Sequence, residues 1–215
     1  MQLPEERAAL VAYCRRMQGD DLTVGTSGNL SVRSGDLIAI TPSGVDYDEL
    51  TPDAICVIDL DGQVVEADLD PSSEVPMHTL VYQATGAGAV VHTHPLYCTA
   101  LSVLLEEVPP IHYMLALLGG PVRVAPYARF GSRQLAENSV SAMAGRTGVL
   151  LRNHGATTYG DTLAKAYTRS LYLEWVCRLY HQARLLGDPA LLTSEQLDEV
   201  GAVIDTYGQS VERGS

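Results

Sequence analysis

Two histidines separated by one residue, His92 and His94, stand at the end of a buried, valine-containing stretch of the sequence. Side chains alternate between the two faces of a β-strand, so both imidazoles are expected to point to the same side. Two imidazoles placed in this way can bind one metal ion. A structural zinc site is closed by four protein ligands, whereas a catalytic site keeps one position open for substrate. The pair therefore raises the question of a third ligand.

His154 is the candidate for that third ligand, because it ends a second apolar strand in the sequence Arg-Asn-His-Gly. A lone histidine is more often a structural residue than a ligand, and spacing alone does not prove that the two strand ends converge. Neutral imidazoles suit Zn²⁺, although other divalent ions remain possible. His78 lies one helical turn after Glu74, and we favour packing over a role as a fourth ligand or as a partner of one.

Glu74 follows Ser72 and Ser73 at the expected start of a helix. One interpretation is a carboxylate that interacts with the helix dipole, which stabilises a helix by under about 1 kcal/mol. The other is a general base beside the metal, which binds the ion in the empty enzyme and takes a proton when substrate displaces it. The sequence leaves both interpretations open.

Three clusters of small residues with hydroxyl groups, over 25–29, 41–44 and 72–73, are each typical of a turn or a cap. Together they would surround a phosphate with backbone N–H groups and hydroxyls, and the helix start at Ser72 would add the positive end of a dipole. None contains a lysine or fits the P-loop spacing. This excludes a Walker-type nucleotide site but not a sugar-phosphate site.

Two tyrosines are candidate proton donors, Tyr113 in Ile-His-Tyr-Met and Tyr207 in Thr-Tyr-Gly. The usual role of a single tyrosine is packing or a surface hydrogen bond. His112 and His181 lack a ligand-like context and are interpreted as structural.

The elements that position these residues change character near residue 72. Before it we expect a helix over 4–18 capped by Gly19, then short strands over 30–33, 37–40, 55–60 and 64–67, the last two joined by an Asp61-Gly62 hairpin turn. After it we expect a helix capped by Ser72 or Ser73, helices over 95–104, 133–144, 161–186 and 193–206, and strands over 89–93, 122–125 and 149–152. On the helix over 161–186 one side is expected to carry Ala164, Tyr167, Leu171, Trp175 and Leu179. The predicted fold class is α/β, a single three-layer domain with a mostly antiparallel central sheet flanked by helices.

Composition limits the classes of partner and compartment. The chain has 215 residues, enough for one domain, with 46% apolar residues and a formal net charge of -12. This acidic balance argues against nucleic acid and anionic membranes as main partners. No apolar run is long enough to span a bilayer, and no signal peptide is apparent. Four scattered cysteines predict reduced core residues of a cytoplasmic protein.

The motifs taken together resemble the class II aldolase family that includes L-fuculose-1-phosphate aldolase. In chain order they are GTSGN (25–29), TPSG (41–44), PSSE (71–74), VVHTHP (90–95), PPIHYM (109–114), APYARFGSRQL (125–135) and NHG (153–155). The resemblance covers nearly the whole chain. It implies a class II aldolase domain over 1–208, and the polar residues over 209–215 predict a mobile tail.

The resemblance also implies a role for each matching residue. His92, His94 and His154 would be zinc ligands, and Glu74 would be the catalytic acid and base and also a ligand in the empty enzyme. The substrate phosphate would be held by Asn29, Ser43, Gly44, Ser72 and Ser73, with the first loop shaped by Thr26 and Gly28. Family members are homotetramers with active sites at subunit interfaces, so Tyr113 would come from a neighbouring subunit and Tyr207 from the C-terminal segment.

The implied reaction is reversible cleavage of a ketose 1-phosphate to dihydroxyacetone phosphate and an aldehyde such as L-lactaldehyde. Related pentulose-phosphate 4-epimerases resemble this chain but carry Asp where Glu74 stands, which favours the aldolase. A methylthioribulose-1-phosphate dehydratase is a further alternative, and a non-catalytic adducin-head-like module lacks the zinc histidines that are present here. The substrate is left among L-fuculose 1-phosphate, L-ribulose 1-phosphate and the 5-deoxy and 5-methylthio pentulose 1-phosphates.

Overall fold

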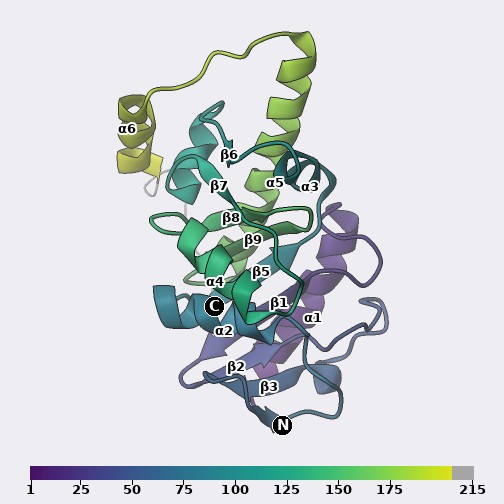
Figure 1. The fold of residues 1–215 in the computed structure, drawn as a ribbon. Helices are drawn as coiled ribbons and strands as arrows, with labels where there is room; N and C mark the ends of the chain where they lie inside the picture. Colours follow the sequence, from purple (N-terminus) through teal and green to yellow (C-terminus); the bar gives the residue numbers. More distant parts are fainter. Residues whose placement is uncertain (205–215) are drawn as a thin grey trace, which may run out of the picture.

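The computed structural model describes residues 1–204 of the chain, and within them nine strands form one sheet. The strands are β1 (Asn29–Ser34), β2 (Leu37–Ile40), β3 (Cys56–Asp59), β4 (Val64–Glu66), β5 (Ala89–Thr93), β6 (Glu107–Val108), β7 (Val122–Ala125), β8 (Gly148–Leu151) and β9 (Gly155–Gly160). Their order across the sheet is β4-β3-β2-β1-β5-β9-β8-β7-β6 (Figure 1). Neighbouring strands are antiparallel except β7 and β8, which are parallel.

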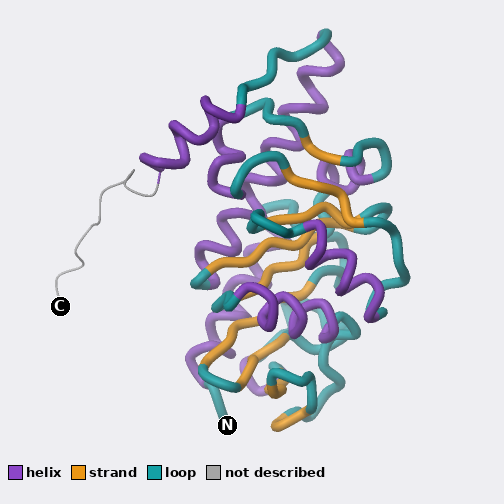
Figure 2. The backbone as a smooth tube through the Cα atoms, turned by 60° about the vertical axis from the view of Figure 1, so that its left-hand side comes forward, coloured by secondary structure: helices purple, strands orange, loops and turns teal. Residues whose placement is uncertain are grey.

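Helices cover both faces of this sheet (Figure 2). On one face lie α1 (Pro4–Gly19) and α5 (Leu163–Leu186), and on the other α2 (Val75–Thr85) and α4 (Arg133–Ala142), each pair sharing a core cluster with the strands. The remaining helices are α3 (Leu96–Ser102), α6 (Ser194–Ile204), and the 3₁₀-helices η1 (Pro52–Ala54) and η2 (Tyr113–Leu118). The expected three-layer α/β fold with a mostly antiparallel sheet is confirmed.

The alternation along β5 explains where its histidine points. Val90 packs in the core cluster under α2 and α4, whereas Ala89 and Val91 pack in the cluster under α1 and α5. Since His92 has the same parity as Val90, it faces the α2 side of the sheet. The strand lies between β1 and β9, and His92 is fully buried. The sheet therefore brings the imidazole beside the start of α2, where Glu74 stands.

Strand β9 is the main element that the sequence did not reveal. Its sequence, Gly-Ala-Thr-Thr-Tyr-Gly, has no apolar run, yet the strand pairs with β5 on one side and β8 on the other. Its buried threonines replace apolar residues because their hydroxyls find partners. The Thr158 hydroxyl donates to the Ala166 carbonyl at 2.8 Å and lies 2.6 Å from the Ser170 hydroxyl. The two-residue strand β6 was also not expected.

Three details at helix ends and faces differ from expectation. Helix α2 begins at Val75, with Glu74 as its N-cap, so neither Ser72 nor Ser73 caps it. Gly19 is the last residue of α1, and Asp20 takes the C-cap position. The residues expected on one side of α5 are mostly four positions apart. Because a helix has 3.6 residues per turn, residues at this spacing do not stay on one face. Of the expected residues only Tyr167 is buried, and the core-facing residues are Leu163, Ala166, Tyr167, Ser170, Leu173, Val176 and Cys177.

Two other expectations concern the whole chain. All four cysteines are buried and free, as predicted. Among the helices of residues 1–204, none combines the length and apolar character needed to cross a membrane.

Candidate metal centre and substrate cavity

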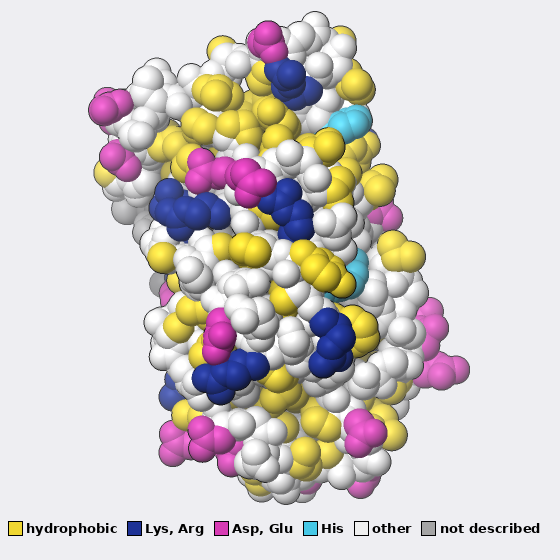
Figure 3. All heavy atoms as spheres, in the orientation of Figure 1, with side chains coloured by type: hydrophobic (Ala, Val, Ile, Leu, Met, Phe, Trp, Pro, Cys, Tyr) yellow, Lys and Arg dark blue, Asp and Glu magenta, His cyan; other side chains and the backbone are white. Residues whose placement is uncertain are grey.

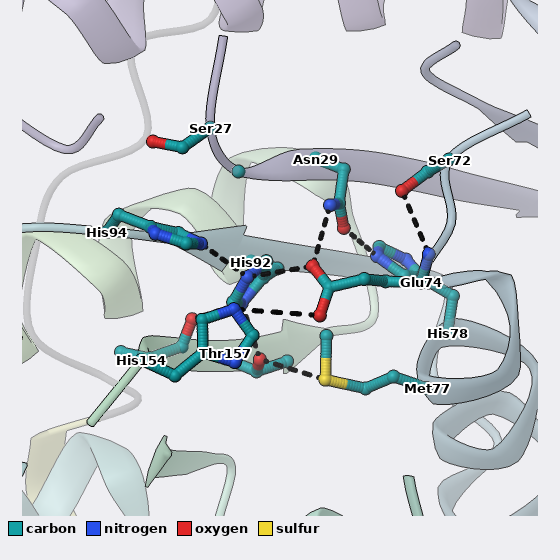
Figure 4. Close-up of polar contacts among 12 residues, drawn as sticks. Ser27, Asn29, Ser72, Glu74, Met77, His78, His92, His94, His154 and Thr157 are labelled. Atoms are coloured by element: carbon teal, nitrogen blue, oxygen red, sulfur yellow. Dashed lines mark hydrogen bonds and ion pairs between the residues drawn. The ribbon is translucent and has the colours of Figure 1, made fainter. Parts of the chain in front are cut away.

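Four side chains predicted to bind a metal come together at one end of the central strands. One donor atom from each of Glu74, His92, His94 and His154 lies within 4.8 Å of the others (Figure 4). His92 and His94 come from β5 and the residue after it, and His154 from the turn between β8 and β9. Because β5 and β9 are antiparallel, with Thr93 opposite Ala156, the end of one lies beside the start of the other.

The histidine nitrogens face Glu74 at short distances. His92 Nε2 lies 2.9 Å from Glu74 Oε2 and 2.9 Å from His94 Nε2, and His154 Nε2 lies 3.7 Å from Glu74 Oε1. The Nδ1–H of His92 donates to the Ala156 carbonyl at 2.9 Å, so in the neutral ring Nε2 keeps a lone pair toward the centre. This backbone contact orients the ring as in many metal-binding histidines.

The chemistry of this donor set fits a divalent cation. Burial, together with the nearby His92, lowers the pKa of His94 to about 3 and that of His154 to about 4, so both rings are neutral near pH 7. Glu74 Oε1 is buried and has no hydrogen-bond partner within the described residues. Lone pairs that converge on one point repel unless a cation lies between them. Three imidazoles and a carboxylate suit zinc well.

The carboxylate of Glu74 is charged although the residue is almost completely buried. Only 5% of the residue is exposed. Burial by itself would raise the pKa of Glu74, but His92 when its ring is protonated, the hydrogen bond from Asn29 and the nearby His154 together hold it well below its ordinary value. The carboxylate is therefore ionised at neutral pH and supplies the negative charge that a bound cation requires.

A cavity of about 320 Å³ opens beside this cluster. All seven residues that were predicted to hold or shape a phosphate site line it, namely Thr26, Gly28, Asn29, Ser43, Gly44, Ser72 and Ser73. Glu74, His94 and His154 line the same cavity. The structure thus places the three hydroxyl-bearing loops and the metal cluster around one space.

The donors on these loops differ from the expected ones. The Ser43 N–H donates to the Asp70 carbonyl and the Ser72 N–H to the Thr41 carbonyl, both at 3.0 Å, so neither points at a ligand. These bonds hold two of the loops together. The helix dipole also starts at Val75 rather than at Ser72. The hydroxyl groups of the serines, rather than these two backbone N–H groups, are the donors that remain.

The predicted tyrosines are not part of this cavity. Tyr113 begins η2 and is 47% exposed, and it does not line the cavity of its own chain. Tyr207 and the predicted tail over 209–215 lie outside the described residues.

Four further cavity residues lie in the motifs over 125–135 and 153–155 but are given no role by the sequence: Tyr127, Ala128, Phe130 and Asn153. Tyr127 and Phe130 are 66% and 59% exposed, in the loop between β7 and α4. Their loop approaches the Ser73 carbonyl closely at Gly131, which has a φ of 69° and no room for a side chain. The sequence feature that indicates a role in the cavity is the pair of aromatic residues in a glycine-containing loop that follows a strand.

Gly155 is expected to be necessary for the geometry of the cluster. A methyl group at this position would overlap the Thr93 carbonyl oxygen and lie 3.3 Å from the His94 ring. Gly155→Ala is therefore expected to destabilise the protein by about 1–3 kcal/mol and to reduce metal content, because the segments that carry His94 and His154 would be pushed apart. Denaturant unfolding and elemental analysis measure the two effects.

Gly201→Ala is the matched control for this substitution. Gly201 lies in α6, and among residues 1–204 an added methyl group there would have no heavy atom within 4 Å other than those of its chain neighbours and its own helix backbone. This control is expected to keep its metal and to gain up to about 1 kcal/mol of helix stability. An unchanged unfolding midpoint and full metal content for Gly155→Ala would contradict the steric argument.

Comparisons with known proteins agree with this arrangement. The family model described as "Class II Aldolase and Adducin N-terminal domain" matches residues 8–181. The 5-deoxy-D-ribulose 1-phosphate aldolase of Bacillus thuringiensis is 37% identical over 97% of this chain and 100% of its own length. The L-fuculose phosphate aldolase of Escherichia coli is 39% identical over 94% of this chain and 95% of its own length. A solved structure of an L-fuculose 1-phosphate aldolase, 39% identical, superimposes with a TM-score of 0.91 over 94% of this chain and 96% of that chain.

Each of these matches spans most of the chain, and the family match over residues 8–181 includes every residue of the cluster and its cavity. The sheet order, the cluster of three histidines and one glutamate, and the family match all lead to the same assignment. The chain belongs to the class II aldolase family and is a class II aldolase.

Proposed function

We propose that the enzyme reversibly cleaves a ketose 1-phosphate to dihydroxyacetone phosphate and an aldehyde. One zinc ion per subunit would be bound by His92, His94 and His154, and also by Glu74 in the empty enzyme, until substrate displaces that carboxylate. The observation that carries the proposal is the convergence of the Glu74 carboxylate and three imidazoles at the wall of a cavity lined by serines. The activities in the names of the two relatives support L-fuculose 1-phosphate or 5-deoxy-D-ribulose 1-phosphate as the substrate.

The three loops bind the phosphate end of the substrate in this proposal. The hydroxyls of Thr26, Ser43, Ser72 and Ser73, together with the N–H of Gly44, donate to phosphate oxygens, while Gly28 shapes the first loop. Gly28 has a φ of 83°, and its missing side chain lets the loop approach the His92 carbonyl. Binding of the phosphate would place the substrate carbonyl beside the histidines. The reacting groups would then be held in position and would not need to meet by diffusion.

A bound divalent ion supplies a Lewis acid that polarises the substrate carbonyl and stabilises negative charge on its oxygen. Glu74 moves the proton at the carbon next to that carbonyl: it delivers the proton in cleavage and removes it in synthesis. Its unpartnered Oε1 is the oxygen available for this transfer. Asn29 links phosphate binding to proton transfer in this proposal. Its side chain donates a hydrogen bond to Glu74, and the residue also lines the cavity.

The enzyme is proposed to work as a cytoplasmic homotetramer in which the neighbouring subunit completes the site. Tyr113 is exposed and outside its own cavity, as a residue that serves a neighbour would be. Tyr113 or Tyr207 then exchanges the proton at the aldehyde oxygen. Apolar side chains gather between α6 and the upper end of α5 in Figure 3, which supports burial of this region against another subunit.

Incubation with dihydroxyacetone phosphate and L-lactaldehyde tests the reaction class. We expect a new ketose phosphate, and a panel of ketose 1-phosphates run in the cleavage direction is expected to rank the L-fuculose or the 5-deoxypentulose compound first. Dihydroxyacetone phosphate release is followed with a coupled reductase. Interconversion of pentulose 5-phosphates without this product would favour the epimerase. Loss of water from 5-methylthioribulose 1-phosphate without cleavage would favour the dehydratase.

A further inference from the structure

Behind Glu74 a buried row of polar side chains runs away from the cavity. Helix α2 presents Glu74, His78 and Tyr82, which are four residues apart and share one face, and β1 presents Asn29 and Ser31, which share one side of the strand. The two sets interdigitate into a single chain of contacts (Figure 4 shows its first members). Of these residues, His78 and Ser31 are fully buried and Tyr82 is 1% exposed.

Each contact in this row is a hydrogen bond. Asn29 Nδ2 lies 2.9 Å from Glu74 Oε2, and Asn29 Oδ1 lies 2.5 Å from His78 Nε2. His78 Nδ1 lies 2.6 Å from the Ser31 hydroxyl, which lies 2.7 Å from the Tyr82 hydroxyl. The row therefore links the catalytic carboxylate to the interior of α2 through four bonds.

The chemistry of the groups fixes the direction of every bond. An ionised carboxylate only accepts, so the amide N–H₂ of Asn29 must face Glu74 and the amide oxygen must face His78. That oxygen needs a donor, so His78 carries its hydrogen on Nε2. Burial, with a smaller contribution from nearby His92, lowers the pKa of His78 to about 3 and keeps the ring neutral. Nδ1 then accepts from Ser31, and Ser31 in turn accepts from Tyr82.

We propose that His78 is a positioning residue for proton transfer: its Nε2–H holds the Asn29 amide in the one orientation that binds Glu74 Oε2. This inference rests on the proposed role of Glu74 as the group that moves the proton. With Oε2 held by Asn29, Oε1 is the oxygen of this carboxylate that has no hydrogen-bond partner within the described residues. In this arrangement Oε2 of Glu74 accepts the hydrogen bond from Asn29, and Oε1 is the oxygen that transfers the proton.

The alternative amide orientation shows why a donor at position 78 matters. If the Asn29 amide rotated by half a turn, its oxygen would face Glu74 Oε2 at 2.9 Å, and two acceptors at that distance repel. His78 excludes this orientation because its Nε2–H would then face an N–H₂ group. A residue that fills the same space without a donor would leave Glu74 alone to select the amide orientation, and the Asn29 amide oxygen would lose its hydrogen bond.

The tautomer of His78 is the first test, and it does not depend on activity. Zinc-loaded enzyme labelled with ¹⁵N-histidine is examined by long-range ¹H–¹⁵N NMR, and the His78 signals are assigned by their loss in the His78→Gln variant. A neutral ring with hydrogen on Nε2 is expected between pH 6 and 9. A hydrogen on Nδ1, or a doubly protonated ring, would overturn the inference.

A matched pair of substitutions is the second test. His78→Gln keeps an N–H donor that reaches Asn29, whereas His78→Met has a similar length and no donor. In the exchange of solvent hydrogen into dihydroxyacetone phosphate, His78→Met is expected to lower kcat about 10–100-fold with little change in KM, as for loss of other groups that orient a site residue. His78→Gln is expected to restore most of this loss. Equal kcat values for the two variants would refute the positioning role.

Ser170→Ala controls for a general loss of stability. It removes a buried hydroxyl pair with Thr158 on the α5 face of the sheet, which is opposite to the face that carries the row. Its unfolding midpoint should fall while exchange stays normal. Glu74→Gln separates this inference from the function on which it rests. If that variant still exchanges hydrogen at the normal rate, the role of Glu74 fails; if it does not, and the two His78 variants are alike, only the positioning role fails.

Discussion

Glu74→Gln is expected to reduce the exchange of solvent hydrogen into dihydroxyacetone phosphate by about 10²–10⁴-fold, the range that general acid–base groups contribute. The amide has the shape of the carboxylate but cannot take up a proton. Its oxygen can still accept the hydrogen bond from Asn29, so the fold around α2 should persist. Three imidazoles remain to hold the metal. The measurement is the loss of the substrate methylene proton signal in deuterated water, monitored by NMR.

The control for this prediction is Glu49→Gln, since Glu49 is exposed and does not line the cavity. Both variants lose one negative charge, but only the Glu74 variant loses a group in the site. Metal content and phosphate binding should be retained in both, which titration calorimetry with inorganic phosphate and elemental analysis report. Exchange at the normal rate in a folded, metal-containing Glu74→Gln variant would move the base to another residue.

The His154→Ala substitution is expected to cause the second large loss of activity. Its side chain is 13% exposed on the turn between β8 and β9, so its removal leaves no large hole in the core. We expect metal content to fall and activity to drop by more than about 100-fold, because loss of a mere partner of a ligand already costs 10–100-fold. Chelator treatment of the unmodified enzyme should produce the same loss, and added Zn²⁺ should reverse it.

His181→Ala tests whether removal of any histidine has this effect. His181 lies on α5, where its ring contacts Tyr97, and it does not line the cavity. This variant should keep its metal and activity. Full activity in a protein shown by elemental analysis to be free of metal would refute the proposed metal requirement.

Local patterns were sufficient to predict most of the fold. The alternation that places His92 and His94 is a property of any strand, and the Asp61-Gly62 turn joins β3 and β4 as expected. The capping box at Thr193 and Gln196 is present at the start of α6. In each case the signal lies within a few neighbouring residues, so no knowledge of distant contacts is required.

Features that depend on distant contacts could not be derived from local patterns. The position of His154 depends on β9, whose threonines are stabilised by partners on α5 and β5 rather than by their own apolar character. The backbone N–H groups of Ser43 and Ser72 form hydrogen bonds between two loops that are about thirty residues apart in sequence, so they do not face the cavity. His78 was interpreted as packing, because its partners Asn29 and Ser31 lie nearly fifty residues earlier. The family resemblance supplied the assignments that spacing left open.

The origin of the four donor atoms links metal binding to the stability of the fold. They come from three separate segments, around residues 74, 92–94 and 154, which converge only when the sheet is assembled. A bound ion therefore acts as a reversible cross-link that favours the native state over the unfolded chain. Each tenfold rise in free ion above its dissociation constant adds about 1.4 kcal/mol to the free energy of unfolding. If the proposed metal requirement holds, the availability of metal would raise the thermal stability of this enzyme as well as its rate.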